Sequence, residues 1–340
     1  MRTYFLCCFF VSTLLFAVKA MATPDLNVRE EVAAAAREAF LRGDFEELNR
    51  KMRAYRLNKD RSPSGLWLLS SYYLGIDYAA RGPVDDNGNP DAGFAPFEKT
   101  TAQWVKAYPK LPAPHIAHAT VLINHAWAYR GYGYSDTIDL KKMPSYWRFL
   151  AAARKHLEDN KRVASVDPQW YRTMLVIAMS ENWSRERFNN LLNEALEREP
   201  LYYESYFKAA GYLLPKWHGN IHDLESFAQE AVKGTFESEG QGMYARIYWS
   251  ASQEHFRDWL FSKSSAKWPQ MRDGFDDIVR RYPDAWNLNS YAKFACWARD
   301  KNKARELLER IGDDIVHSAW MSESQRLACK NWVLYPAPRG

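Results

Sequence analysis

Three histidines form the most concentrated set of metal-binding side chains in this sequence. His115, His118 and His125 lie at offsets of three and ten residues, which place their imidazoles on one side of a helix. Imidazole nitrogens bind zinc and copper. The spacing differs from the one-turn HExxH pair, and no carboxylate follows at helical spacing to complete a site. We therefore expect hydrogen-bonded, partly buried histidines and assign no metal, with these three as the leading candidates for one.

The sequence lacks the short motifs that carry catalysis or hold cofactors. It contains no G-x-S-x-G elbow, no phosphate-binding G-x-x-x-x-G-K-[ST] loop and no dinucleotide-binding G-x-G-x-x-G after a strand. We therefore assign no catalytic residue and no cofactor. Two carboxylates that only the fold brings together could still hydrolyse a glycosidic bond. A hydrolase acting on envelope carbohydrate thus stays open as an alternative function.

Aromatic residues are abundant, with 14 Trp, 20 Tyr and 17 Phe. We expect most of them to fill gaps between helices, where each buries a large area. Some could instead line a groove and stack on sugar or peptide groups. Two turns carry such side chains, the first from Arg130 to Tyr134 and the second from Leu213 to Gly219. We expect Trp217, in the second turn, to be exposed. The candidate binding residues in these turns are Arg130, Tyr132, Tyr134, Lys216, Trp217 and His218.

Residues 1–22 have the pattern of a secretory signal peptide. Arg2 supplies the positive start, an uncharged and mostly apolar run follows from Tyr4 to Val18, and small residues precede a cleavage site after Ala22 or, alternatively, after Ala20. The apolar run is shorter than the roughly 20 residues that span a bilayer. We expect an exported protein, periplasmic or secreted, with no membrane span in the mature chain.

Two cysteines, Cys296 and Cys329, follow the signal peptide. Export would place them in an oxidising compartment. Their separation is close to the ~34-residue period of helical hairpin repeats, which brings equivalent positions near one another. A disulfide and a pair of buried free thiols both remain open at this stage.

Charge is nearly balanced along the chain. The whole sequence carries a formal charge of +5, and the chain after Ala22 carries +3 because Arg2 and Lys19 leave with the signal. Basic and acidic residues are interspersed, which indicates a solvated surface without a nucleic-acid patch. We therefore expect a protein or peptide partner and no nucleic acid.

Apolar residues recur with helical spacing throughout, and no segment alternates in the manner of a strand. Asp44 with Glu47, and Asn220 with Asp223, are expected to form capping boxes. We expect a helix to begin at Pro63, a loop over residues 82–96, and one helix over residues 240–261. The pattern predicts an all-α fold, an irregular α-solenoid of tetratricopeptide-like helical hairpins over residues 23–332, followed by a mobile tail at 333–340.

Two stretches carry a family resemblance. The first is the turn from Arg130 to Tyr134, and the second comprises Asn182-Trp183, the Glu199–Tyr202 junction and the Leu213–Gly219 turn, LLPKWHG. Across residues 97–311 the chain resembles an uncharacterised family of bacterial domains, helical and similar to tetratricopeptide and Sel1-like repeats. The resemblance implies a helical-repeat fold and brings no catalytic residue.

These observations favour an exported helical-repeat protein that binds a protein or peptide, with no catalysis assigned. Helical arrays present extended concave surfaces suited to that task. Besides the carbohydrate hydrolase, an accessory or effector protein of a secretion system remains an alternative.

Overall fold

The computed structural model describes residues 25–82, 84–85, 88–131, 133 and 138–335. Within these residues the chain is helical and forms no strand, with a helix content of 78%. The predicted all-α class is therefore confirmed. The predicted signal peptide lies outside the described residues.

The described part of the chain begins with an N-terminal arm of three helices, which is followed by a row of helices. The arm comprises α1 (Asp25–Arg42), α2 (Phe45–Asn58) and α3 (Leu68–Ala79). The row comprises α4 (Asp91–Ala107), α5 (Pro112–Arg130), α6 (Met143–Asp159), α7 (Lys161–Ala164), α8 (Pro168–Ser180), α9 (Arg185–Arg198), α10 (Tyr203–Tyr212), α11 (Ile221–Glu239), α12 (Gly242–Ala251), α13 (Leu260–Lys263), α14 (Trp268–Arg281), α15 (Ala285–Trp297), α16 (Lys301–Ile311) and α17 (Glu323–Leu334).

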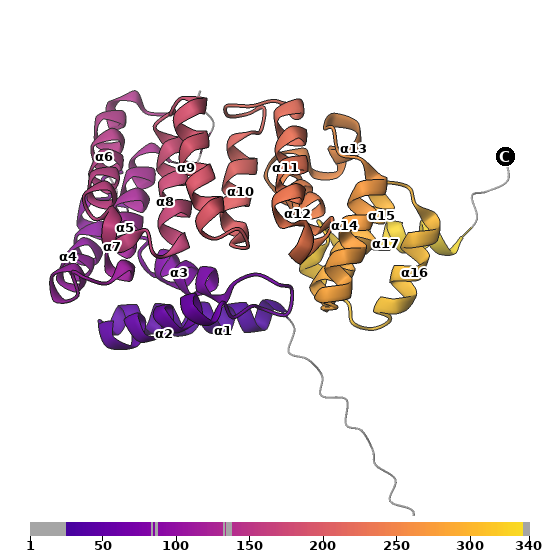
Figure 1. Ribbon diagram of the computed structural model, residues 1–340, viewed down its shortest axis with the longest axis horizontal. Coiled ribbons are helices and arrows are strands. Elements are labelled where there is room, and N and C mark those ends of the chain that lie inside the picture. Colours follow the sequence, from indigo (N-terminus) through magenta and orange to yellow (C-terminus); the bar gives the residue numbers. More distant parts are fainter. Residues whose placement is uncertain (1–24, 83, 86–87, 132, 134–137, 336–340) are drawn as a thin grey trace, which may run out of the picture.

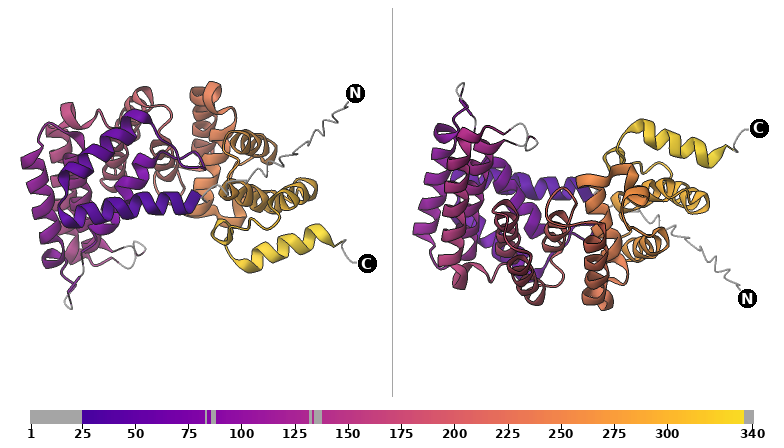
Figure 2. Two further views of the ribbon diagram at one scale, coloured as in Figure 1. Left: turned by 90° about the horizontal axis from the view of Figure 1, so that it is seen from below. Right: turned by 90° about the horizontal axis from the view of Figure 1, so that it is seen from above.

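The helices of the row follow one another in chain order, and α1 and α2 lie across one edge of the row (Figure 1). The arm packs on the first half of the row through contacts of α3 with α5, and it reaches the second half through contacts of α1 with α15. Figure 2 shows the same arm running along the row in two further views. The arm therefore ties together helices that are far apart in the sequence.

One hydrophobic cluster extends from α1 to α17. Large aromatic side chains fill it, as expected: Trp104 and Trp170 are almost fully buried, and the rings of Phe188 and Tyr212 stack 3.6 Å apart. Burial of each large ring stabilises the fold by roughly 2–3 kcal/mol relative to exposure. The aromatic richness of the sequence is thus mainly a property of the core.

The two expected capping boxes have different outcomes. At α11 the box is complete, because Asn220 and Asp223 exchange hydrogen bonds with one another's backbone N–H groups. At α2 the Asp44 carboxylate accepts a hydrogen bond from Glu47 N at 3.1 Å, but the Asp44 N–H donates to Ala39 O at 2.9 Å. The Glu47 side chain therefore pairs with Arg50 instead.

Two expected boundaries are wrong. Helix α4 begins at Asp91 and contains Pro96, so the loop ends earlier than residue 96. The reason is burial of Phe94, whose ring stacks on His125 at 4.6 Å and holds this segment against α5. Residues 62–67 form a turn, and α3 begins at Leu68 and not at Pro63, because Ser62 N donates to Leu66 O and closes the turn.

The single helix expected over residues 240–261 is also wrong. Helix α12 ends at Ala251, a π-helical turn follows at Ser252–Phe256, and a short 3₁₀ turn at Arg257–Trp259 leads into α13. The helical path is interrupted where Arg257 takes a φ of 50°. Such π-turns often occur beside functional sites.

At the C-terminus, α17 runs to Leu334, two residues into the predicted tail, and residues 336–340 lie outside the described part. None of the described helices has the length and apolar character needed to cross a membrane.

Candidate functional site

A groove of about 550 Å³ lies between α9 and α11, with α10 as its floor. We call it the α9–α11 groove. Its apolar lining includes Phe188 and Leu192 of α9 and Phe227 of α11, all of which are buried in the core. Tyr206 of α10 closes the floor and donates a hydrogen bond to Pro200 O at 3.0 Å. Desolvation raises the pKa of Tyr206 to about 12, so this hydroxyl stays a neutral donor.

Polar side chains border the groove in two stripes. Each stripe has members four residues apart, so its members lie on one face of their helix. Apart from one glycine, every member has an exposed side chain. None of these side chains forms a hydrogen bond or ion pair within the described chain. The α9 stripe is Asn189, Asn193 and Glu197, and the α11 stripe is Ser226, Glu230 and Gly234.

The two helices run parallel, because their first turns are joined at one end of the groove. Arg185 Nη2 donates to Asp223 Oδ2 at 3.0 Å and to His218 O at 2.8 Å. This contact links both walls to the turn before α11. Sequence reasoning missed the stripes, although their spacing of four beside the apolar positions of α9 is visible in the sequence.

The expected residues of the Leu213–Gly219 turn lie at this end of the groove. Lys216 Nζ donates to Glu254 O at 2.8 Å, and the His218 ring stacks on Tyr212 at 4.6 Å. Trp217 is partly buried and packs against the core. Trp217, which was expected to be exposed, is therefore only partly so, because the turn folds back on α10.

Arg130 ends α5, and its guanidinium lies 4.9 Å from the ring centre of Trp127. No hydrogen bond, ion pair or ring contact between described residues joins it to the Leu213–Gly219 turn. Tyr132 and Tyr134 lie outside the described residues. The structure thus gives no evidence that the two candidate turns form one site.

The three candidate histidines of α5 separate into two environments. His115 Nδ1 lies 3.2 Å from His156 Nε2 on α6, and His118 Nδ1 lies 2.8 Å from Thr101 Oγ1. Desolvation, reinforced by the neighbouring imidazoles, lowers the pKa of His156 to about 4. These rings are therefore hydrogen-bonded and packed as expected.

His125 lies away from the other two histidines. Its Nδ1 is 2.5 Å from Glu98 Oε1, its Nε2 is 3.0 Å from Asp91 Oδ1, and Phe149 stacks on its ring at 3.8 Å. No group of three or more metal-binding side chains in the described ranges has the arrangement of a metal site.

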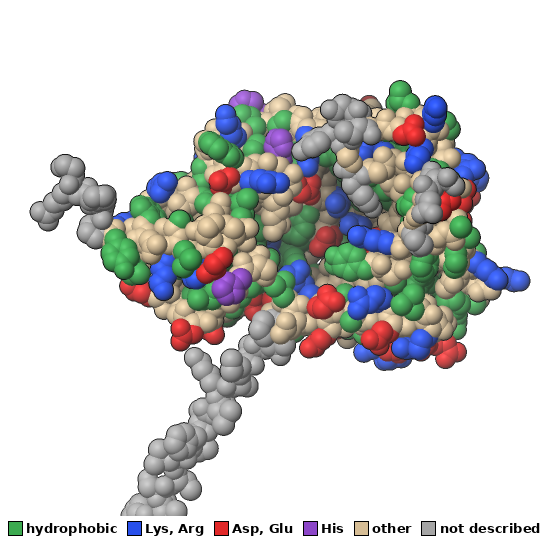
Figure 3. Space-filling model, turned by 180° about the vertical axis from the view of Figure 1, so that it is seen from behind, with side chains coloured by type: hydrophobic (Ala, Val, Ile, Leu, Met, Phe, Trp, Pro, Cys, Tyr) green, Lys and Arg blue, Asp and Glu red, His purple; other side chains and the backbone are tan. Residues whose placement is uncertain are grey.

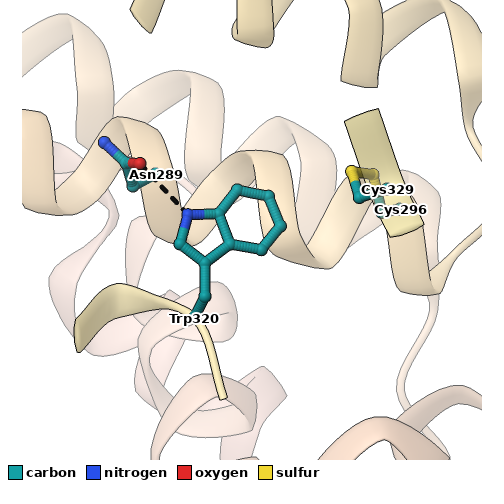
Figure 4. The surroundings of a disulfide bond; sticks show 4 residues. All are labelled: Asn289, Cys296, Trp320 and Cys329. Carbon is teal, nitrogen blue, oxygen red and sulfur yellow. Dashed lines mark hydrogen bonds between the residues drawn. A yellow bond between two sulfur atoms is a disulfide. The ribbon is translucent and has the colours of Figure 1, made fainter. Parts of the chain in front are cut away.

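Cys296 and Cys329 form a disulfide that joins α15 to α17, with Cα atoms 5.8 Å apart (Figure 4). Beside it, Trp320 Nε1 donates to Asn289 Oδ1 at 3.1 Å. The disulfide is consistent with an oxidising compartment outside the cytoplasm.

No protein-family model, curated protein or solved structure matches the chain. No family is therefore identified, and the resemblance to an uncharacterised bacterial family stays a prediction. The structure itself establishes an all-helical protein in its described part.

Proposed function

We propose that this protein is an exported, solenoid-like helical scaffold that binds an extended peptide segment of another protein in the α9–α11 groove. The observation that carries the proposal is the pairing of an apolar floor with two stripes of unpartnered polar side chains. Such a surface suits a peptide, whose backbone needs hydrogen-bonding partners and whose side chains need pockets.

The spacing of the stripes matches an extended chain. Residues four apart on a helix are separated by about 6 Å along its axis. Alternate residues of an extended peptide are separated by about 6.6 Å. The amides of Asn189 and Asn193 can each donate to and accept from one peptide group. Each stripe spans about 12 Å, so we expect about four peptide residues to be held.

The acidic rim gives the peptide a preferred charge. Glu197 and Glu230 are exposed and unpaired, whereas Arg185 at the opposite end is already paired with Asp223. We therefore expect a basic residue in the part of the peptide nearest Glu197 and Glu230, next to an apolar residue that enters the floor. Binding should weaken with added salt, because exposed charges are screened.

A substitution at Gly234 tests the proposal by blocking the α9–α11 groove. A Cβ atom built at Gly234 meets nothing within 4 Å, so a larger side chain there enters open space without disturbing α11. We expect Gly234→Trp to block the groove and Gly234→Ala to leave it open. Selection of random peptides on the wild type, with counter-selection on the Gly234→Trp protein, should enrich short sequences with basic and apolar residues.

Asparagine variants test the backbone contacts. For an enriched peptide, fluorescence anisotropy should show about fivefold weaker binding for Asn193→Ala, since one net hydrogen bond contributes about 1 kcal/mol. Asn190→Ala is the matched control, because Asn190 is an exposed asparagine of the same helix outside the groove. Failure to enrich any sequence over the Gly234→Trp protein, or equal effects of both asparagine variants, would disprove the proposal.

The acids that line this groove are Asp223, Glu197 and Glu230, and all are at least partly exposed. A buried acid, which a glycosidase needs as its proton donor, is not among them. No observation in the groove therefore favours the hydrolase alternative.

A further inference from the structure

A second cavity, of about 150 Å³, lies where the N-terminal arm meets α10, α12 and α15. Arg29 of α1 and Leu66 of the turn before α3 form one wall, and Phe207 of α10 and Trp286 of α15 belong to the others. We call it the inner pocket. Near the middle of one face the molecule is hollowed, and hydrophobic, basic and acidic side chains lie together there (Figure 3).

Three buried polar atoms of the inner pocket have no hydrogen-bonding partner in the described chain. They are Arg246 Nε, Trp249 Nε1 and Asn287 Oδ1. The three residues are only 4%, 7% and 0% exposed. Buried polar groups almost always have partners, and an unmet one costs about 1–3 kcal/mol. Two donors and one acceptor on residues that line one cavity are therefore left for a polar ligand or ordered water to satisfy.

The charge of Arg246 points to an anion. Its Nη2 donates to Ser64 O at 2.9 Å, and its guanidinium lies 4.8 Å from the Tyr203 ring and 5.7 Å from the Tyr282 ring. No carboxylate among the described residues lies within ion-pairing distance of it, including the buried Glu239, whose Oε1 accepts from Tyr282. A buried charge without a counter-ion is costly, so an anion in the pocket would stabilise it.

Arg29 contributes less charge to the pocket than Arg246. Its Nε donates to Asp25 Oδ2 at 2.6 Å, and the Asp25 carboxylate, which is 1% exposed, neutralises it. The Arg29 guanidinium also lies 5.8 Å from the Trp286 ring centre. Arg29 therefore mainly helps to shape the wall.

Aromatic rings form much of the rest of the inner pocket. The rings of Trp249 and Trp286 are stacked with centroids 6.1 Å apart, and Phe207 lies on another side. A cavity of about 150 Å³ holds a molecule the size of benzene. The pocket also has a route to solvent, because Ser250 is half-buried and Gln253, in the π-turn after α12, is exposed.

We propose that the inner pocket binds a small organic carboxylate whose apolar part is about the size of a six-membered ring. The carboxylate lies between Arg246 Nε and Trp249 Nε1, the ring packs against Trp286 and Phe207, and Asn287 Oδ1 accepts a hydrogen bond from a hydroxyl or amino group of the ligand. This site is separate from the α9–α11 groove and shares no lining residue with it.

The test uses 4-fluorobenzoate as the probe and ¹⁹F NMR of the purified protein as the readout. We expect the probe signal to broaden and shift with protein, and unlabelled benzoate to reverse the effect. The neutral isostere 4-fluorobenzamide should bind at least about tenfold more weakly, because it lacks the charge that Arg246 requires. Equal binding of the amide, or equal competition by inorganic phosphate or chloride, would overturn the proposal.

Two variants keep the test independent of folding defects at Arg246. Trp249→Phe retains the stacked ring and removes the N–H donor, so we expect about tenfold weaker binding of 4-fluorobenzoate. Trp147→Phe is the matched control, because Trp147 is an exposed tryptophan of α6 outside the pocket, and it should leave binding unchanged.

We expect Ser250→Leu to abolish binding, because the larger side chain fills the mouth of the pocket. The Ser250 side chain forms no hydrogen bond in the described chain, so the substitution breaks none. If no carboxylate probe binds at millimolar concentration, the unpartnered atoms hold ordered water only and the proposal is wrong. Unchanged binding in both Trp249→Phe and Ser250→Leu would place the probe elsewhere and equally refute it. Peptide binding in the α9–α11 groove should be unaffected by either variant, which separates the two proposals.

Discussion

Replacing both Cys296 and Cys329 by alanine removes the covalent link between α15 and α17. The disulfide closes a loop with a sequence separation of 33. In the chain-entropy model, a loop of that length stabilises the fold by about 4 kcal/mol at 25 °C. Loss of the buried Cys329 side chain, which is 6% exposed, adds up to about 1 kcal/mol. We therefore expect the variant to lose about 4–5 kcal/mol of unfolding free energy.

Other contacts should keep the variant folded at low denaturant. Lys293 Nζ donates to Ala319 O at 2.8 Å, and Trp320 Nε1 donates to Asn289 Oδ1 at 3.1 Å (Figure 4). These bonds hold the segment before α17 on α15 without the disulfide. The weakened region is then α17 itself, which should open locally before the rest of the molecule.

Urea unfolding followed by circular dichroism measures the loss, and limited proteolysis locates it. The variant should unfold at lower urea, and its first cleavage should fall within residues 312–334. Wild-type protein treated with reductant is the control, because it loses the disulfide without any change of sequence. Its unfolding free energy should match that of the variant within about 1 kcal/mol. An unchanged midpoint, or two alkylatable thiols in wild-type protein purified from an oxidising compartment, would refute the reasoning.

Two further predictions concern stability. Gly234→Ala should raise the unfolding free energy by up to about 1 kcal/mol, because alanine is the better helix former and the added Cβ meets no atom within 4 Å; an unchanged or lower urea midpoint would contradict this. Burial raises the pKa of Asp167 from 3.8 to about 6, against the hydrogen bonds from Gln169 N and Tyr73. A folded pKa above the unfolded one means that the stabilising contribution of this group is fully present below about pH 4 and is lost as the pH rises through 6, a loss of roughly 3 kcal/mol. Asp167→Asn keeps a capping oxygen and stays neutral, so its urea midpoints should lack that decline between pH 4 and 6; an equal decline in the variant would count against the raised pKa.

The helical class and several helix starts follow from sequence because they depend on neighbours in the chain. Apolar spacing within one helix, and caps such as Asn220 with Asp223, involve residues no more than a few positions apart. The separation of Cys296 from Cys329 likewise suggested a pairing that the structure contains. Exposure was harder to infer, since Trp217 in a polar turn is held against the core by long-range packing.

The two proposed sites needed the tertiary structure for different reasons. In the α9–α11 groove, each stripe is a local pattern, but only packing against α10 places the two stripes opposite one another. In the inner pocket even the local structure depends on distant residues. The turn before α3 replaces the helix expected at Pro63. Ser64 O in that turn accepts hydrogen bonds from Arg246 and Asn287, which are 182 and 223 residues away from Ser64 in the sequence.

The sequence alone therefore determined the all-α class, individual helices, caps and the candidate cysteine pair. The tertiary structure decided how the N-terminal arm closes on α12 and α15, and with it which polar atoms are buried without a partner. The physical reason is the distance along the sequence between the residues that interact. Helices form through hydrogen bonds three or four residues apart, whereas a pocket is formed by side chains from elements that meet only after the whole chain has packed.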